Sequence, residues 1–276
     1  MGGSRLRVGV YVDVENISRT GGRGLRFDTL RAFACREGAD ALRLNAYLAF
    51  DEERAQRDPD YRNRSLRYHF ALRSFGFKVI EKAVQWYTTE DGTRVSKANS
   101  DLDLAVDMLL QSAKLDRVLL VSGDGDFVQV VRALQNLGCR VEVLAFQNVS
   151  HRLRCEADVF VSGYVIPGLL PQQDEPPWGE LNSRVRGTCH HYNHERGFGF
   201  LRYLVNVDNL DLTDPREAGS PYRTAFFHRT ACQLPNADVD LLPNHDMIFE
   251  FTLSPGKQQG MMTAQDVTLV TRYPAL

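Results

Sequence analysis

The sequence predicts an α/β region built on a parallel sheet with helices on both faces, followed by a small all-β barrel. Two observations lead to this fold class. Between residues 7 and 165, short apolar segments rich in Val and Leu alternate with segments whose apolar residues recur at helical spacing. This alternation is typical of a buried parallel sheet. Beyond residue 183, short β-rich segments, turns and aromatic residues continue without a helical period, which favours a barrel or sandwich.

Each element of the first region is expected from a local pattern. The strands are apolar runs, of which Val118-Leu119-Leu120-Val121 is the clearest. The helices carry apolar residues three and four apart, and two of them end at Gly76 and Gly138, because glycine readily takes the left-handed conformation found after a helix. In chain order we expect strand 7–13, helix 27–37, strand 41–50, helix 61–75, strand 77–80, helix 99–114, strand 117–121, helix 127–137 and strand 140–146.

A proline-rich stretch separates the two regions. Residues 166–183 hold four prolines among glutamines and acids, which is typical of a linker. A chain of 276 residues is long enough for two domains. We therefore expect a first domain over residues 5–165, a linker over 166–183 and a second domain over 184–276.

The composition excludes several classes of protein. Lys and Arg number 33 against 35 Asp and Glu, a net charge of −2, which argues against a protein that coats nucleic acid by bulk charge. No apolar run reaches the ~20 residues that span a bilayer, and Arg5 and Arg7 interrupt any signal-peptide segment. Five scattered cysteines without a C-x-x-C pair indicate reduced thiols in a cytoplasmic protein. The composition leaves the oligomeric state open.

Acidic residues are expected at the edge where the parallel strands end, which is where open α/β sheets bind ligands. Asp13 ends the first strand, and Asp124 and Asp126 follow the apolar strand near residue 120. Asp101 lies in the first turn of a helix that also carries Asp107, a candidate second-tier acid. Carboxylates that converge repel one another unless a cation such as Mg²⁺ or Mn²⁺ neutralises them. Such an ion can also activate a water and stabilise a phosphodiester displacement.

Each acid also has a purely structural interpretation. Asp13 can cap a turn, and Ser122 to Phe127 can form a simple turn. Asp101 can be an ordinary first-turn acid of a helix that Asn99 or Ser100 caps.

The second region carries an aromatic pattern. In a strand, Phe198 and Phe200 point to one face, and the glycines beside them leave the rings uncovered. Phe226 and His228 share a face by the same period. Two such strands side by side would form a platform on which unpaired bases stack, at roughly 1–3 kcal/mol per base. The alternative is that these rings fill the barrel core, where we expect Phe227.

Three motifs of the first region resemble the NYN domain, a branch of the PIN-like ribonuclease fold. Tyr11-Val12-Asp13-Val14-Glu15-Asn16 resembles its first-strand signature, and Ser122-Gly123-Asp124-Gly125-Asp126-Phe127 its third motif. Residues 97–107 resemble the Lys-Gly-Val-Asp segment of LabA-like bacterial members, although Asn99-Ser100 stands where Gly-Val is usual. The resemblance implies a Mg²⁺- or Mn²⁺-dependent ribonuclease for single-stranded RNA. Its metal-binding, catalytic acids would be Asp13, Asp101, Asp124 and Asp126, with Asn16 as an orienting amide.

The second region resembles a cold-shock domain of the OB-fold class. Residues 195–201 (E-R-G-F-G-F-L) resemble its first RNA-binding motif, residues 225–231 its second, and residues 256–267 its last loop and strand. The resemblance implies RNA contacts from Tyr192, Asn193, Phe198, Phe200, Phe226 and His228. His191 stands where a tryptophan is usual, and an insertion over 204–223 separates the two motifs.

Together the two regions suggest a metal-dependent ribonuclease whose cold-shock-like module presents single-stranded RNA; DNA is a further possible substrate. The alternative is an RNA-binding regulator whose acidic cleft binds metal or RNA without cleaving. A phosphatase starting from Asp13 is disfavoured, because Glu15 stands where that chemistry needs a second Asp. A dinucleotide site is disfavoured because Gly21-Gly22-Arg23-Gly24 does not match G-x-G-x-x-G.

Overall fold

The computed structural model describes residues 5–88, 91, 94–97, 101–172, 176–256 and 260–275. The chain forms two compact units. The first comprises Met1–Arg23, Phe27–Ala145 and Arg152–Val161, and the second comprises Gly24–Arg26, Phe146–His151 and Ser162–Leu276. No helix among the described residues has the length and apolar character of a membrane span.

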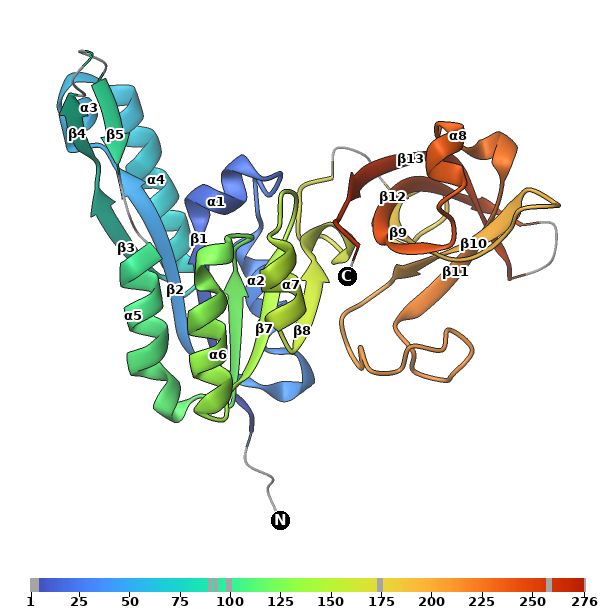
Figure 1. The fold of residues 1–276 in the computed structure, drawn as a ribbon, viewed down its shortest axis with the longest axis horizontal. Helices are drawn as coiled ribbons and strands as arrows, with labels where there is room; N and C mark the ends of the chain where they lie inside the picture. Colours follow the sequence, from blue (N-terminus) through green and yellow to red (C-terminus); the bar gives the residue numbers. More distant parts are fainter. Residues whose placement is uncertain are drawn as a thin grey trace. The chain divides into compact units, whose positions relative to one another are not determined.

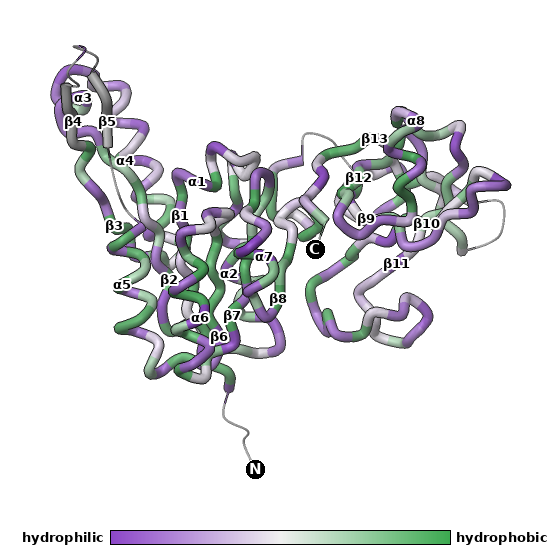
Figure 2. Tube along the Cα trace, viewed as in Figure 1, coloured by the Kyte–Doolittle hydropathy of each residue, from purple (hydrophilic) through white to green (hydrophobic). Residues whose placement is uncertain are grey.

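A six-stranded sheet with the order β3-β2-β1-β6-β7-β8 forms the centre of the α/β region (Figure 1). Its strands are β1 (Arg7–Asp13), β2 (Asp40–Phe50), β3 (Lys78–Ala83), β6 (Arg117–Val121), β7 (Arg140–Ala145) and β8 (Val159–Ser162). The pairings from β3 through β7 are parallel. β6 is buried along its whole length, and Figure 2 shows it as mostly hydrophobic. These observations confirm the predicted parallel sheet.

Helices cover both faces of this sheet, because right-handed crossovers run outward in both directions from the central strands. α5 (Asp101–Gln111) and α6 (Val128–Asn136) pack on one face and α2 (Phe27–Ala34) on the other (Figure 1). The remaining helices are α1 (Val14–Arg19), α3 (Glu52–Arg57), α4 (Pro59–Ser74) and α7 (His151–Glu156), with the 3₁₀ turns η1 (Arg36–Gly38), η2 (Ser112–Lys114), η3 (Gly125–Phe127) and η4 (Gly163–Val165).

The elements predicted for the first region are present, and several short elements were not predicted. α1, α3, α7, β8 and the hairpin strands β4 (Gln85–Thr88) and β5 (Arg94–Lys97) were not expected, since segments of 4 to 6 residues are too short to show a period. The helix expected over 99–114 is α5 followed by η2. Asn99 and Ser100, proposed as its caps, lie outside the described residues.

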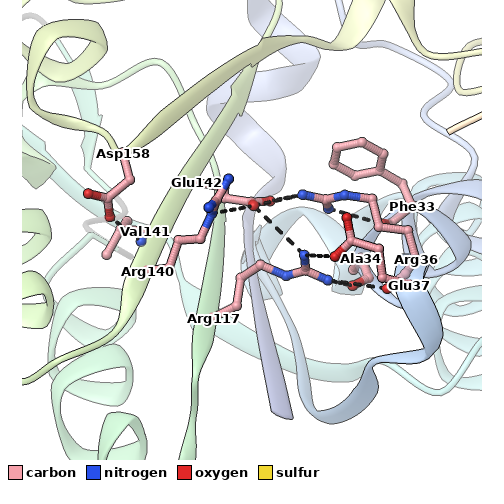
Figure 3. A network of polar contacts seen from close by, with 9 residues as sticks. All are labelled: Phe33, Ala34, Arg36, Glu37, Arg117, Arg140, Val141, Glu142 and Asp158. Carbon is pink, nitrogen blue, oxygen red and sulfur yellow. Dashed lines mark hydrogen bonds and ion pairs between the residues drawn. The ribbon is translucent and has the colours of Figure 1, made fainter. Parts of the chain in front are cut away.

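A buried ionic network lies at the edge of the sheet where the strands begin (Figure 3). Glu142 is fully buried and accepts two hydrogen bonds from Arg36, both of 2.7 Å, and one of 3.2 Å from Arg140. Arg117, the first residue of β6, lies 3.9 Å from Glu142 and donates to Glu37 at 3.2 Å. This network therefore ties β6 and β7 to η1 at the edge opposite to Asp13.

The second region is a closed barrel with the strand order β10-β11-β13-β12-β9. Its strands are β9 (Arg184–Asn193), β10 (Phe198–Leu204), β11 (Tyr222–His228), β12 (Asn244–Pro255) and β13 (Met262–Arg272), with η5 (Arg229–Ala231) and the one-turn helix α8 (Asn236–Val239) between β11 and β12. β11 and β13 pair in parallel, and the other pairs are antiparallel. A five-stranded closed barrel of this kind fits the OB-fold class.

The segment predicted as a linker is packed at several described positions. Ile166 and Leu169 are buried. The Nε1–H of Trp178 donates to the carbonyl of Leu204 at 2.7 Å. The Trp178 contact ties this part of the segment to the end of β10.

Candidate functional site

An acidic candidate site forms where β1 and β6 end side by side. Val12 pairs with Val121, so Asp13 and Ser122 follow at the same edge of the sheet. The hydroxyl of Ser122 donates to Oδ2 of Asp13 at 3.3 Å, and the N–H of Asn16 donates to Oδ1 at 3.0 Å. The side-chain carbonyl of Asn16 in turn accepts the N–H of Gly123 at 3.0 Å. Asn16 therefore links the two strand ends.

The loop after β6 supplies two further acids. The N–H of Asp124 donates to the hydroxyl of Ser122 at 3.2 Å, and the carboxylate of Asp124 accepts the N–H of Asp126 at 3.0 Å, so Asp124 caps η3. Asp124 is half-buried and Asp126 is exposed. The glycines on both sides of Asp124 leave this short loop free of bulky side chains, so both acids remain accessible to a ligand.

The acids at this edge lie within each other's electrostatic field. Asp13 is only 4% exposed, and its burial raises its pKa to about 6, although the Asn16 N–H opposes the rise; Asp101 and Asp124 raise the pKa further. The pKa of Asp101 is raised by partial burial and then by Asp124, Asp126 and Glu15. Glu15 is the acid that sequence reasoning missed, although it lies two residues after Asp13 in the same motif.

The side chains gathered at this edge offer oxygen ligands, the type that a hard divalent cation prefers. Among the described residues, no group of three or more His, Cys, Asp or Glu side chains is arranged to hold a metal ion. A magnesium ion, however, needs only one or two carboxylates and keeps several waters. The raised pKa of the buried Asp13 carboxyl reflects burial and repulsion from neighbouring acids, and a divalent cation would offset both.

A separate candidate site is an aromatic cluster on the outer face of the barrel. On β10, Phe198 pairs with His228, and Phe200 pairs with Phe226 of β11. The ring centroids of Phe198 and Phe226 lie 5.7 Å apart in a stacked arrangement, and those of Phe200 and Phe226 lie 5.8 Å apart edge to face. All three rings are half-buried, whereas Phe227 lies in the core, as predicted, with 1% exposure. Part of each ring therefore remains available for stacking.

Gly199 allows this cluster to form. A Cβ at Gly199 would lie 2.4 Å from the carbonyl oxygen of His191 and 2.7 Å from the ring of Phe227. Both distances are far below normal contact distances. A residue with a side chain here would therefore push β9 away from β10 or displace a core ring.

Residues 7–169 match the NYN domain family over more than half of the chain. The chain belongs to the NYN domain family. It is 24% identical over 177 residues to the low amplitude and bright protein LabA of Synechococcus elongatus, a match that covers 62% of this chain and 90% of that protein. A crystal structure of a protein of unknown function from Vibrio parahaemolyticus is also similar, with 27% identity, a TM-score of 0.47, and coverage of 59% of this chain and 96% of that one.

Within the NYN domain, the structure does not place Asp107 with the other acids. Its carboxylate accepts the hydroxyl of Tyr47 at 2.8 Å. Gln111, one turn further along α5, accepts the hydroxyl of Tyr11 at 3.2 Å. Asp103 is not part of the acid cluster either, because its carboxylate accepts a hydrogen bond from Lys82 at 2.8 Å. Asp107 therefore helps to fasten α5 to the sheet, and Asp101 at the start of that helix is the acid at the carboxyl edge.

Beyond the NYN domain, Tyr192 differs from the expected stacking residues. It is 7% exposed, and its ring centroid lies 5.7 Å from that of Phe227 in the barrel core. The cause is an irregularity in the pairing of β9 with β10, where Phe200 pairs with His191 but Leu201 pairs with Cys189. His190 and His191 therefore both point outward, with His191 beside Phe200, and Tyr192 points into the core. Asn193 accepts the N–H of Arg196 at 2.9 Å and shapes the turn, and the exposed His228 lies 2.9 Å from the hydroxyl of Thr230.

Proposed function

We propose that this protein is a Mg²⁺- or Mn²⁺-dependent ribonuclease that cleaves single-stranded RNA bound by its barrel. The observation that supports this most strongly is the acid cluster at the carboxyl edge of the sheet, where burial, and then the neighbouring carboxylates, raise the pKa values of Asp13 and Asp101. Membership of the NYN family, whose domains are typically nucleases, supports the same reaction.

The acids would divide their roles according to burial. The buried Asp13 carboxylate is fixed by Asn16 and Ser122, and each of its oxygens keeps a lone pair for a metal ligand bond. The half-buried Asp101 and Asp124 and the exposed Asp126 would complete the metal-binding set toward the substrate. The bound ion would supply an activated water and offset the negative charge that develops during phosphodiester displacement.

The barrel would bind the RNA substrate in the manner of a cold-shock module. Phe198, Phe200 and Phe226 present half-buried rings on one face, with His191 and His228 at the ends of the two cross-strand rows. Stacking is worth roughly 1–3 kcal/mol per base. Because the chain has a net charge of −2, we expect stacking to contribute more to binding than bulk electrostatic attraction.

A non-cleaving RNA-binding regulator is the second candidate. The observation that favours it is that, within the described residues, the acids do not form a ready three-ligand metal group. In that case the cluster would bind a cation or RNA only weakly, and the barrel would provide the function.

Incubation of the full chain with end-labelled single-stranded RNA separates the two candidates. If the protein is a ribonuclease, cleavage products should form with Mn²⁺ or Mg²⁺. None should form with EDTA, and none with the Asp124→Asn variant. Asp103→Asn is the matched control, because Asp103 lies on the same helix as Asp101 but pairs with Lys82; it should cleave like the wild type. RNA that is bound by the wild type but left intact would favour the regulator, and cleavage that survives in Asp124→Asn would contradict the proposed site.

A further inference from the structure

The insertion between β10 and β11, residues 205–221, is the long orange connection in Figure 1 and contacts two outward side chains at one end of the aromatic face. The carbonyl of Thr213 accepts Nη1 of Arg202 at 3.3 Å, and the carbonyl of Leu210 accepts the hydroxyl of Tyr222 at 3.2 Å. Within the insertion, Ser220 donates to the carbonyl of Leu212 at 2.7 Å. The insertion therefore holds Arg202 and Tyr222 in place.

Arg202 and Tyr222 continue the outer face that carries the phenylalanines. Arg202 lies two residues after Phe200 on β10 and pairs with Thr224 of β11. At a strand rise of about 3.3 Å per residue, this places Arg202 about 7 Å along the strand from Phe200. Its guanidinium lies 4.8 Å from the ring centroid of Tyr222. The three phenylalanines and this Arg–Tyr pair therefore form one continuous row.

The charge of Arg202 remains available to a ligand. Over the part of the chain that the structure describes, no carboxylate forms an ion pair with Arg202. The nearby acid of the insertion, Asp214, is bound by Arg216 through contacts of 2.7 to 3.2 Å, which hold the pKa of Asp214 at about 2. Asp211 lies near Tyr222 but does not pair with Arg202. Among the described residues, the acidic insertion thus leaves Arg202 without a carboxylate partner at the end of the aromatic row.

We propose that Arg202, stacked on Tyr222, binds the phosphate of the nucleotide adjacent to those stacked on the phenylalanines. A guanidinium matches phosphate geometry with two parallel donors, and only one of its donors is used by the Thr213 carbonyl. Because the insertion and Tyr222 already restrict the side chain, binding costs less conformational entropy than with a free arginine. The inference rests on the proposed RNA-binding function and adds a subsite to it.

Fluorescence anisotropy with labelled oligouridylates of about 4 and about 12 nucleotides, which bracket the site sizes of OB folds, tests the subsite. For the longer RNA, Arg202→Gln should weaken binding about fivefold to tenfold and reduce the slope of log K against log salt by about 0.7. Arg202→Lys should keep the salt slope of the wild type. The shorter RNA covers the three phenylalanines and the adjacent nucleotide, so Arg202→Gln should weaken its binding by a similar factor.

Arg184→Gln is the matched control, because it also removes one positive charge from the barrel, but from an arginine of β9 that already pairs with Glu250. Both RNAs should bind this variant with the wild-type salt slope. If Arg202→Gln matches the wild type for the longer RNA, or if Arg184→Gln lowers the slope equally, the subsite is refuted while RNA binding itself stands. If the wild type binds neither RNA, the proposed RNA-binding function fails and the subsite with it.

Discussion

Replacement of Asp13 by asparagine should stabilise the metal-free protein at neutral and alkaline pH. The pKa of Asp13 rises from 3.8 in an exposed carboxyl to about 6 in the folded chain, chiefly because the group is buried. One pKa unit corresponds to about 1.4 kcal/mol, so the ionised group costs the folded state up to about 3 kcal/mol at about pH 8. Asparagine caps a helix about as well as aspartate, so we expect a gain of about 2 kcal/mol.

The sign of this effect follows from proton linkage. Because the folded-state pKa is raised, the folded chain binds the proton more tightly than the unfolded chain. The destabilisation is therefore complete above about pH 6 and disappears below about pH 4, where Asp13 is protonated in both states. The difference in stability between Asp13→Asn and the wild type should follow the same course.

Urea unfolding in EDTA at about pH 4 and about pH 8 measures this difference. Added Mn²⁺ should stabilise the wild type but not Asp13→Asn. Asp116→Asn is a control of opposite sign, because hydrogen bonds from Arg7 lower the pKa of Asp116 to about 2, so this variant should lose stability at the higher pH. An Asp13→Asn protein that is less stable than the wild type at about pH 8, or equally changed at both pH values, would refute the reasoning.

Three further substitutions test other parts of the structure. Glu142→Gln removes the carboxylate that neutralises Arg36 and Arg117 in the sheet and should lower the free energy of unfolding by about 3–5 kcal/mol in urea; an unchanged midpoint would contradict this. Gly199→Ala should lower the melting temperature of the barrel, because the new Cβ would lie 2.4 Å from the His191 carbonyl oxygen; an unaltered melting curve would show that β9 adjusts freely. Tyr192→Phe should leave RNA affinity unchanged in an anisotropy titration, since the Tyr192 ring lies in the core. A large loss of RNA affinity would instead show that Tyr192 contacts the RNA.

The sequence predicted the fold class and the place of the acids because both depend on strong local patterns. The buried run of β6 and the alternation on β10 are visible in the residues themselves. Since the carboxyl ends of parallel strands meet at one edge, the position of Asp13 at the end of β1 was enough to bring it near the loop that holds Asp124.

Other features depend on contacts between residues distant in the sequence. The side chain of Asp107 faces the sheet because Tyr47 donates to it, and no local pattern shows that partner. The inward position of Tyr192 depends on the irregular pairing at His190, which shifts the alternation along β9. The return of the insertion to Arg202 likewise depends on backbone carbonyls, whose positions the residue types do not specify.

The most direct test of the two-part account compares Asp124→Asn and Phe226→Ala in RNA binding and in single-turnover cleavage with Mn²⁺. We predict that Asp124→Asn binds RNA like the wild type but does not cleave it. Phe226→Ala should bind about tenfold or more weakly, as expected for the loss of one stacked base, yet cleave at the wild-type rate once RNA is saturating. Cleavage by Asp124→Asn at the wild-type rate, or RNA affinity unchanged in Phe226→Ala, would contradict the account.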